Sequence, residues 1–145
     1  MATWERLTRE ACRYLFIIPL VVGSTGYSQP NKEQYDLEER CGKRADEVFR
    51  REYETPPKMR GFTFNYRNHY SPKLNKCFFV EISTSMIDAH RMSTQYRLFD
   101  LNENKELGSF YKQSDGFMTC VVGTRPCASE AEWNTLISPY MGDEW

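Results

Sequence analysis

The sequence predicts an α+β fold, in which an antiparallel sheet of about five strands is flanked by an N-terminal and a C-terminal helix and held by two disulfides. Three observations lead to this prediction. Apolar residues recur at every third or fourth position in residues 35–53 and again after residue 129, as on amphipathic helices. Short runs of alternating apolar and polar residues lie between these segments. Four cysteines are spread over the same region, and helices around an antiparallel sheet define the α+β class.

The first helix is expected over residues 35–53. Its apolar positions are three or four residues apart and therefore share one face; they are Leu37, Cys41, Ala45, Val48, Phe49 and Tyr53. Most charged residues of the segment occupy the opposite face, which predicts a solvated surface. The helix is expected to end before Pro56 and Pro57, because proline lacks a backbone donor and restricts the residue before it.

Five strands are expected over residues 61–70, 77–85, 95–101, 106–111 and 117–122, with reversals at 71–75, 102–105 and 114–116. Residues 86–93 are compatible with a loop or with one helical turn. In the second strand, both faces carry apolar residues, so either both faces are buried or a β-bulge lies near Cys77. Glu81 lies in this apolar strand, and a buried carboxylate there would need a partner.

The last helix is expected to start at Ser129. Ser129 and Glu132 have the spacing of a capping box, in which two side chains satisfy free backbone donors of the first turn. The apolar face is formed by Trp133, Leu136, Ile137 and Tyr140. Pro139 is expected to kink or end the helix near its last turn.

Residues 1–28 have the pattern of a secretory signal peptide, with arginines, then the apolar run 15–22, then small residues up to an expected cleavage after Ser28. A bilayer-spanning helix needs about twenty apolar residues, and Pro19 interrupts this shorter run, so no stable membrane span is expected after cleavage. We expect a periplasmic or secreted protein. The alternatives are a membrane tether formed by an uncleaved segment, and an amphipathic first helix of a cytosolic protein.

Residues 29–145 are expected to form one small domain. The chain has 19 Lys and Arg and 20 Asp and Glu, of which residues 1–28 hold three and two, so the mature domain has a net charge near −2. This balance gives no general attraction to nucleic acid or to an anionic membrane surface.

Cys12 lies in the signal segment, which leaves Cys41, Cys77, Cys120 and Cys127. An even number of cysteines in an exported chain predicts two disulfides, and four cysteines permit three pairings. We favour Cys41–Cys77 and Cys120–Cys127, because the second pair flanks a short stretch with turn-forming residues. A zinc site is the weaker alternative, because zinc motifs favour cysteines two to four residues apart.

Candidate functional residues are few, and no cofactor is expected. The chain has two histidines; Asp88 precedes His90, and Ser71 follows His69. A catalytic triad depends on spatial geometry that this spacing does not supply, and His69 and His90 lack metal-ligand spacing. Cations are also mixed with aromatics that can stack on bases or sugars, at Arg60, Tyr66, Arg67, Tyr70, Tyr96 and Arg97. The surface-site candidates are Tyr66, Arg67, His69, Tyr70 and His90.

Two segments of the chain resemble small exported bacterial proteins of unassigned function. They are residues 69–78, HYSPKLNKCF, and residues 127–133, CASEAEW, the latter followed by Pro139-Tyr140-Met141. The resemblance covers most of the mature domain and implies a bacterial periplasmic or secreted protein. It implies no catalytic residues.

These observations favour an exported, non-enzymatic module that binds a protein, an envelope component or a small ligand. Such a module should present an exposed apolar or aromatic patch. The alternative is a small hydrolase in which His69 or His90 meets a carboxylate within hydrogen-bond reach. A purely structural role is a third alternative.

Overall fold

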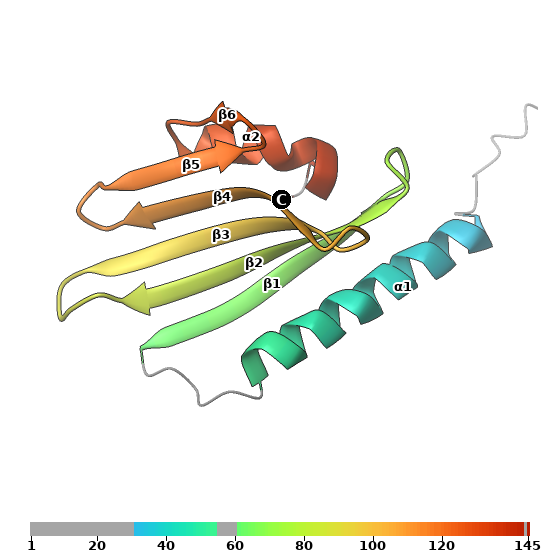
Figure 1. Cartoon of the computed structure of the whole chain (residues 1–145), viewed down its shortest axis with the longest axis horizontal. Coiled ribbons are helices and arrows are strands. Elements are labelled where there is room, and N and C mark those ends of the chain that lie inside the picture. The colour runs from blue at the N-terminus through green and yellow to red at the C-terminus, as the bar shows by residue number, and fades with distance from the viewer. Residues whose placement is uncertain (1–30, 55–60, 144) are drawn as a thin grey trace, which may run out of the picture.

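The computed structural model describes residues 31–54, 61–143 and 145, and consists of two helices around one sheet (Figure 1). The predicted signal segment, its cleavage site and Arg60 lie outside these residues. The elements are α1 (Lys32–Phe49), a π-helical turn η1 (Arg50–Glu54), β1 (Phe62–Ser71), β2 (Lys76–Met86), β3 (Met92–Asp100), β4 (Lys105–Gln113), β5 (Met118–Val122), β6 (Arg125–Pro126) and α2 (Glu130–Met141).

The six strands form one antiparallel sheet in the order of the chain, β1-β2-β3-β4-β5-β6. The predicted α+β class is therefore confirmed, and the additional strand β6 has only two residues. The ambiguous segment 86–93 contains the end of β2 and the start of β3, which a loop over residues 87–91 connects. In the part described, neither helix is both long and apolar enough to cross a lipid bilayer.

Both faces of β2 are buried, which decides between the two alternatives for this strand. On one side, Phe78 and Val80 pack with Trp133 and Ile137 of α2; we call this side the α2 face. On the other side, Cys77 and Phe79 pack with residues of α1; we call this side the α1 face. The sheet therefore has a separate apolar core on each side.

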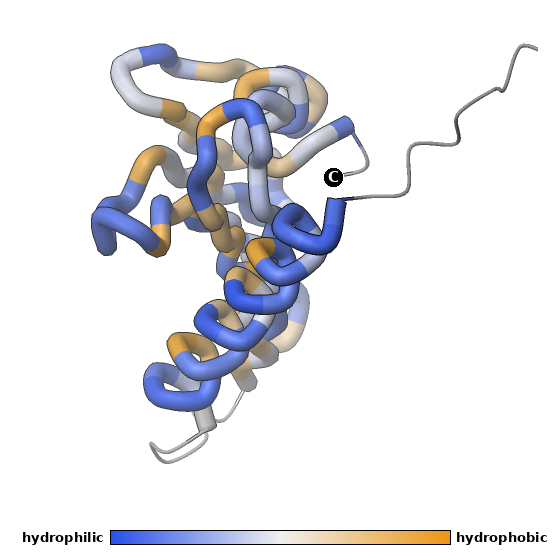
Figure 2. Tube along the Cα trace, turned by 90° about the vertical axis from the view of Figure 1, so that its right-hand side faces the viewer, coloured by the Kyte–Doolittle hydropathy of each residue, from blue (hydrophilic) through white to orange (hydrophobic). Residues whose placement is uncertain are grey.

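Helix α1 is amphipathic and is attached to the sheet by a disulfide. Figure 2 shows a mostly hydrophilic helix in which hydrophobic residues recur from turn to turn. Cys41 and Ala45 are buried against the sheet, and Cys41 is bonded to Cys77. The second predicted disulfide, Cys120–Cys127, closes the β5–β6 hairpin. Both predicted pairings are thus present.

The predicted capping box at the start of α2 is present, with one difference. The Ser129 hydroxyl accepts the Glu132 backbone N–H at 3.1 Å, while the Glu132 carboxylate accepts the backbone N–H of Ala128 rather than that of Ser129, at 2.7 Å. The helix continues past Pro139 to Met141. Because proline has no N–H, the Thr135 carbonyl lacks its helical donor, and the Ser138 hydroxyl donates to it at 3.1 Å.

A β-bulge lies between β3 and β4 and not near Cys77. The register shifts between Leu98 and Phe99, so that Phe99 pairs with Glu106. An unbroken register would pair Glu106 with Asp100, on the α2 face. The bulge instead turns the Glu106 side chain to the α1 face, as bulges commonly re-aim side chains.

Candidate functional site

The alternation along β1 separates the predicted site residues. Tyr66 and Tyr70 lie on the α1 face, opposite Glu81 and Cys77 of β2. The Tyr66 ring lies 5.3 Å from the ring of Phe79, between ring centroids, and the buried Tyr70 donates its hydroxyl to Asn75 Oδ1 at 2.7 Å. Both tyrosines therefore pack in the core on the α1 face of the sheet.

Arg67 and His69 lie on the opposite, α2 face of β1, near the C-terminal end of α2. Both line an open hollow of about 620 Å³, together with Met141 and Trp145. The Arg67 guanidinium carbon lies 5.5 Å from the centroid of the Trp145 ring. Tyr66 also borders this hollow, so three of the five predicted site residues share a site, whereas Tyr70 and His90 lie elsewhere.

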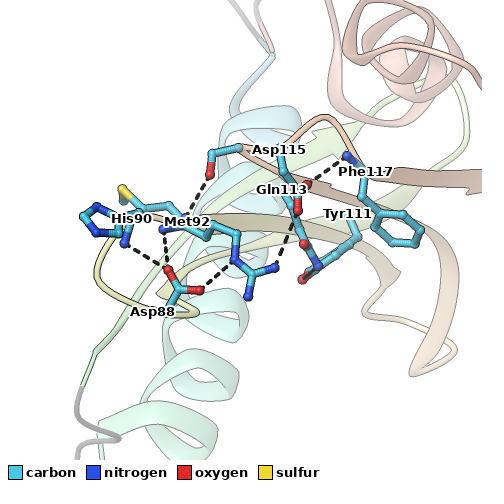
Figure 3. A network of polar contacts seen from close by, with 9 residues as sticks. Asp88, His90, Met92, Tyr111, Gln113, Asp115 and Phe117 are labelled. Atoms are coloured by element: carbon cyan, nitrogen blue, oxygen red, sulfur yellow. Dashed lines mark hydrogen bonds and ion pairs between the residues drawn. The ribbon is translucent and has the colours of Figure 1, made fainter.

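His90 lies in the exposed loop between β2 and β3, shown with its surroundings in Figure 3. The Asp88 carboxylate accepts the backbone N–H of His90 at 2.9 Å and that of Arg91 at 3.0 Å. It also pairs with the Arg91 guanidinium at 2.7 Å. The backbone N–H of His90 and then the Arg91 side chain hold the pKa of Asp88 below its ordinary value.

The hydrolase alternative requires an imidazole beside a carboxylate. Among the residues described, no hydrogen bond or ion pair joins the ring of His69 or of His90 to a carboxylate, since Asp88 contacts the backbone of His90. The same residues contain no group of three or more His, Cys, Asp or Glu side chains able to hold a metal ion.

An apolar patch lies at the end of the sheet on the left of Figure 1, where the β2–β3 and β4–β5 connections lie. Met86, Ile87 and Met92 are 60%, 40% and 51% exposed, and we call these three residues the tip patch. Met86 and Met92 are register partners, and the Ile87 N–H donates to the Arg91 carbonyl at 2.8 Å, so the three residues are close neighbours at the end of the β2–β3 hairpin. Phe62 and Phe117 are exposed at the same end of the sheet.

Polar contacts stabilise the loop that carries the tip patch (Figure 3). Arg91 bridges Asp88 of its own loop to Asp115 of the β4–β5 turn, where Nη1 lies 3.6 Å from the carboxylate. Met92 and Ser114 exchange two hydrogen bonds, because the Met92 N–H donates to the Ser114 hydroxyl and the Ser114 N–H donates to the Met92 carbonyl. The two connections therefore support each other.

A second candidate is a hollow of about 200 Å³ between the α1 face and the end of α1 with η1. We call it the Glu81 hollow; its lining includes Val48, Tyr53, Phe79, Glu81, Arg97 and Leu101. The Glu81 side chain is only 8% exposed, and its Oε2 lies 3.4 Å from Nη1 of Arg97. The expected partner of this buried carboxylate is therefore present.

The Arg97 guanidinium is shared between two carboxylates. Its Nη2 and Nε lie 2.7 and 3.2 Å from Oε2 of Glu106, closer than its contact with Glu81. Tyr53 adds a hydroxyl to the site. Burial, and then the hydrogen bond and charge of Glu81, raise the pKa of Tyr53 above its ordinary value, so this phenol stays protonated at neutral pH.

The sequence singled out Glu81 and Arg97 but not Tyr53 or Glu106. Tyr53 was placed on the apolar face of the first helix, where it does lie against the sheet; its ring stacks on Phe64 at 4.6 Å between centroids. Glu106 reaches the α1 face only because of the β3–β4 bulge. Finding Glu106 would have required the register of the β3–β4 hairpin, which the sequence alone does not show.

Comparison with known proteins identifies no relative. No protein-family model matches the chain, and no curated protein and no solved structure matches it. A functional assignment therefore depends on the residues described above.

Proposed function

We propose that this protein is an exported, non-enzymatic interaction module that binds a protein partner through the tip patch. One observation carries the proposal: the exposed large apolar side chains are concentrated at one end of the sheet. Of eight such side chains among the residues described, five lie there: Phe62, Met86, Ile87, Met92 and Phe117. Clustered apolar exposure is typical of interaction sites, whereas single exposed apolar residues are ordinary.

The chemistry of the tip patch favours a protein with an apolar surface as the partner. Two of its three residues are methionines, Met86 and Met92, whose flexible thioether side chains adapt to different apolar shapes. The backbone beneath them is held by the contacts of Asp88, Arg91 and Asp115. A backbone that is already fixed lowers the entropy lost when a partner binds, while the methionine side chains can adapt to the shape of the partner.

Two features support export. Disulfides persist in oxidising compartments such as the periplasm or the extracellular space, and the chain has two of them. The N-terminal pattern of basic, apolar and small residues supports the same location. The resemblance to small exported bacterial proteins supports a bacterial envelope as the setting.

The proposal is tested with affinity capture from extracts of the protein's own compartment, with the disulfides intact. The test variant combines Met86→Gln and Met92→Gln, which keep side-chain length and remove apolar character. The matched control is Leu74→Gln, because Leu74 is 41% exposed in the β1–β2 turn, away from the patch. All three positions are exposed, so the free energies of unfolding should stay within a few tenths of a kcal/mol of wild type.

We expect one partner to be captured by the wild type and by the Leu74 variant, and lost by the double methionine variant. Purified partner should then bind the wild type with at least about tenfold higher affinity than the double variant, the effect of losing about 1.4 kcal/mol of apolar contact. Capture of the same proteins by all three forms would show that the tip patch is not the binding surface.

A further inference from the structure

The Glu81 hollow has features of a small-ligand site that the proposed protein interaction does not use. It lies on the α1 face, whereas Met86 and Met92 of the tip patch lie on the α2 face at the end of the sheet. One wall of the hollow is formed by residues of η1, and π-helical turns occur frequently at functional sites. The hollow is about 200 Å³ in volume. A cavity of about 150 Å³ takes a benzene molecule, so a ligand of about seven non-hydrogen atoms fits.

The charge of Glu81 is not fully compensated. Arg97 contacts two carboxylates, the buried Glu81 in the lining and the 39% exposed Glu106 outside it, so these three groups together carry one net negative charge. At the mouth, Arg51 and Glu52 pair with each other at 3.0 Å and add no net charge. Because Arg97 makes its closer contacts with Glu106, the buried Glu81 carboxylate is incompletely compensated, and such a carboxylate favours a cation over a neutral molecule or an anion.

The carboxylate that carries this charge has unused acceptor capacity. An ionised carboxylate offers about four lone-pair sites. Among the residues described, Glu81 accepts a 3.4 Å contact from Arg97 and the hydrogen bond of the Tyr53 hydroxyl. The nitrogens Nη2 and Nε of Arg97 are engaged with Glu106. A ligand with several donors therefore finds acceptors at Glu81.

Part of the lining of the hollow is apolar. Val48 and Leu101 contribute aliphatic surface, and Phe79 contributes an aromatic ring. The second aromatic wall, Phe99, has its ring covered by the Arg97 guanidinium at 4.8 Å from the centroid. The remaining lining is polar and includes Arg51, Glu52, Arg97 and Asn104, so the hollow combines apolar walls with two cationic and two anionic side chains, of which Glu81 is the buried carboxylate.

From these contacts we infer that the Glu81 hollow binds a short primary alkylammonium. The ammonium group donates hydrogen bonds to the Glu81 carboxylate and to the oxygen of the Tyr53 hydroxyl, and the alkyl chain lies against Val48, Phe79 and Leu101. An ammonium has three donors and no acceptor, which matches a site rich in acceptors. An anion of the same shape is repelled by Glu81.

The experiment compares three probes of equal size and different charge on the oxidised wild-type protein at neutral pH: hexylammonium, hexan-1-ol and pentanoate. Titration followed by backbone-amide NMR gives both affinity and location. We expect hexylammonium to shift amides of η1, β2 and β3 around the hollow and to bind at least about tenfold more tightly than hexan-1-ol, because one charged hydrogen bond is lost with the alcohol. Pentanoate is expected not to bind.

Two variants locate the interaction. Glu81→Gln keeps the side-chain shape and removes its charge, and is expected to weaken hexylammonium binding by about tenfold or more. Glu130→Gln is the matched control; Glu130 begins α2 and contacts Tyr96, away from the hollow, so binding should be unchanged. The double methionine variant of the tip patch should also bind hexylammonium like the wild type, which separates this inference from the proposed protein interaction.

The inference is overturned if hexylammonium does not bind at millimolar concentration, if the three probes bind equally, or if pentanoate binds more tightly. It is likewise overturned if a folded Glu81→Gln protein keeps wild-type affinity. The probe series on the wild type decides the question even if that variant does not fold.

Discussion

The two disulfides are expected to contribute unequally to stability, and the loops that they close determine the order. Cys41–Cys77 joins positions 36 residues apart, and Cys120–Cys127 joins positions 7 residues apart. In the chain-entropy model the longer loop contributes about 3.8 kcal/mol and the shorter about 2.5 kcal/mol. Replacing Cys41 and Cys77 together by alanine should therefore cost about 1.3 kcal/mol more than replacing the other pair.

Burial increases this difference. Cys41 and Cys77 are 3% and 6% exposed within the α1-face core, whereas Cys120 and Cys127 are only partly buried. Loss of two buried sulfur atoms leaves a small cavity in that core, which adds to the cost. The Cys41–Cys77 bridge also joins α1 to the sheet, so hydrogen exchange should accelerate first in α1 when this bridge is removed.

The assay is urea unfolding followed by far-ultraviolet circular dichroism, with the remaining disulfide verified by mass spectrometry. Each pair is replaced by alanine in a separate protein, and the free energies of unfolding are compared with wild type. Equal costs, or a larger cost for the Cys120–Cys127 pair, would refute the loop-length reasoning. A cost below about 1 kcal/mol for Cys41–Cys77 would contradict the entropic account altogether.

Two further predictions concern single side chains. Asp100→Asn should destabilise the protein by about 1–2 kcal/mol at pH 7, because Asp100 is 1% exposed and pairs with Lys76 Nζ at 2.7 Å. Burial alone would raise the pKa of Asp100, but Lys76 and two backbone N–H groups hold it below its ordinary value. The stabilisation by the Asp100 carboxylate is therefore complete above the unfolded pKa of about 3.9 and is lost as the pH falls through the folded pKa. The free energies of unfolding of the variant and the wild type should accordingly converge in acid. A difference that stays constant with pH would contradict this assignment. Gly108→Ala should cost about 1–2 kcal/mol, because the new Cβ would lie 2.8 Å from the Val121 carbonyl oxygen. Gly42→Ala in α1 is the control: the nearest atom of a neighbouring element to its new Cβ is Asn68 Nδ2 at 3.9 Å, so this change should instead stabilise the protein by about 0.5–1 kcal/mol in thermal unfolding.

Local patterns predicted both helices and five of the six strands; the two-residue strand β6 was not predicted. The apolar spacing around Cys41 and Ala45 predicted α1, and the pair Ser129 and Glu132 predicted the start of α2. These features depend on neighbours a few residues away, whose geometry a helix or strand largely determines. The same locality explains why several boundaries differ by a few residues, since helix ends such as η1 depend on packing against the sheet, whereas the end of β5 at Val122 and the N-cap Ser129 are as predicted.

The candidate sites could not be predicted in the same way. His69 and Tyr70 are adjacent in the chain and lie on opposite faces of the sheet, whereas Glu81 and Glu106 are distant in the chain and meet at Arg97. Which strand lies beside which, and in what register, depends on long-range pairing. A one-residue shift moves a side chain to the other face.

The sequence by itself determined the α+β class and the apolar content of both faces of β2, and it favoured one of the three possible pairings of the four cysteines, which the structure contains. Only the tertiary structure decided that the β3–β4 bulge turns Glu106 toward Arg97, that η1 brings Tyr53 over Glu81, and that Met86 and Met92 stand side by side at the tip. The physical reason is that secondary structure follows from interactions between near neighbours, whereas a site is made by side chains that only the register of the folded sheet brings together.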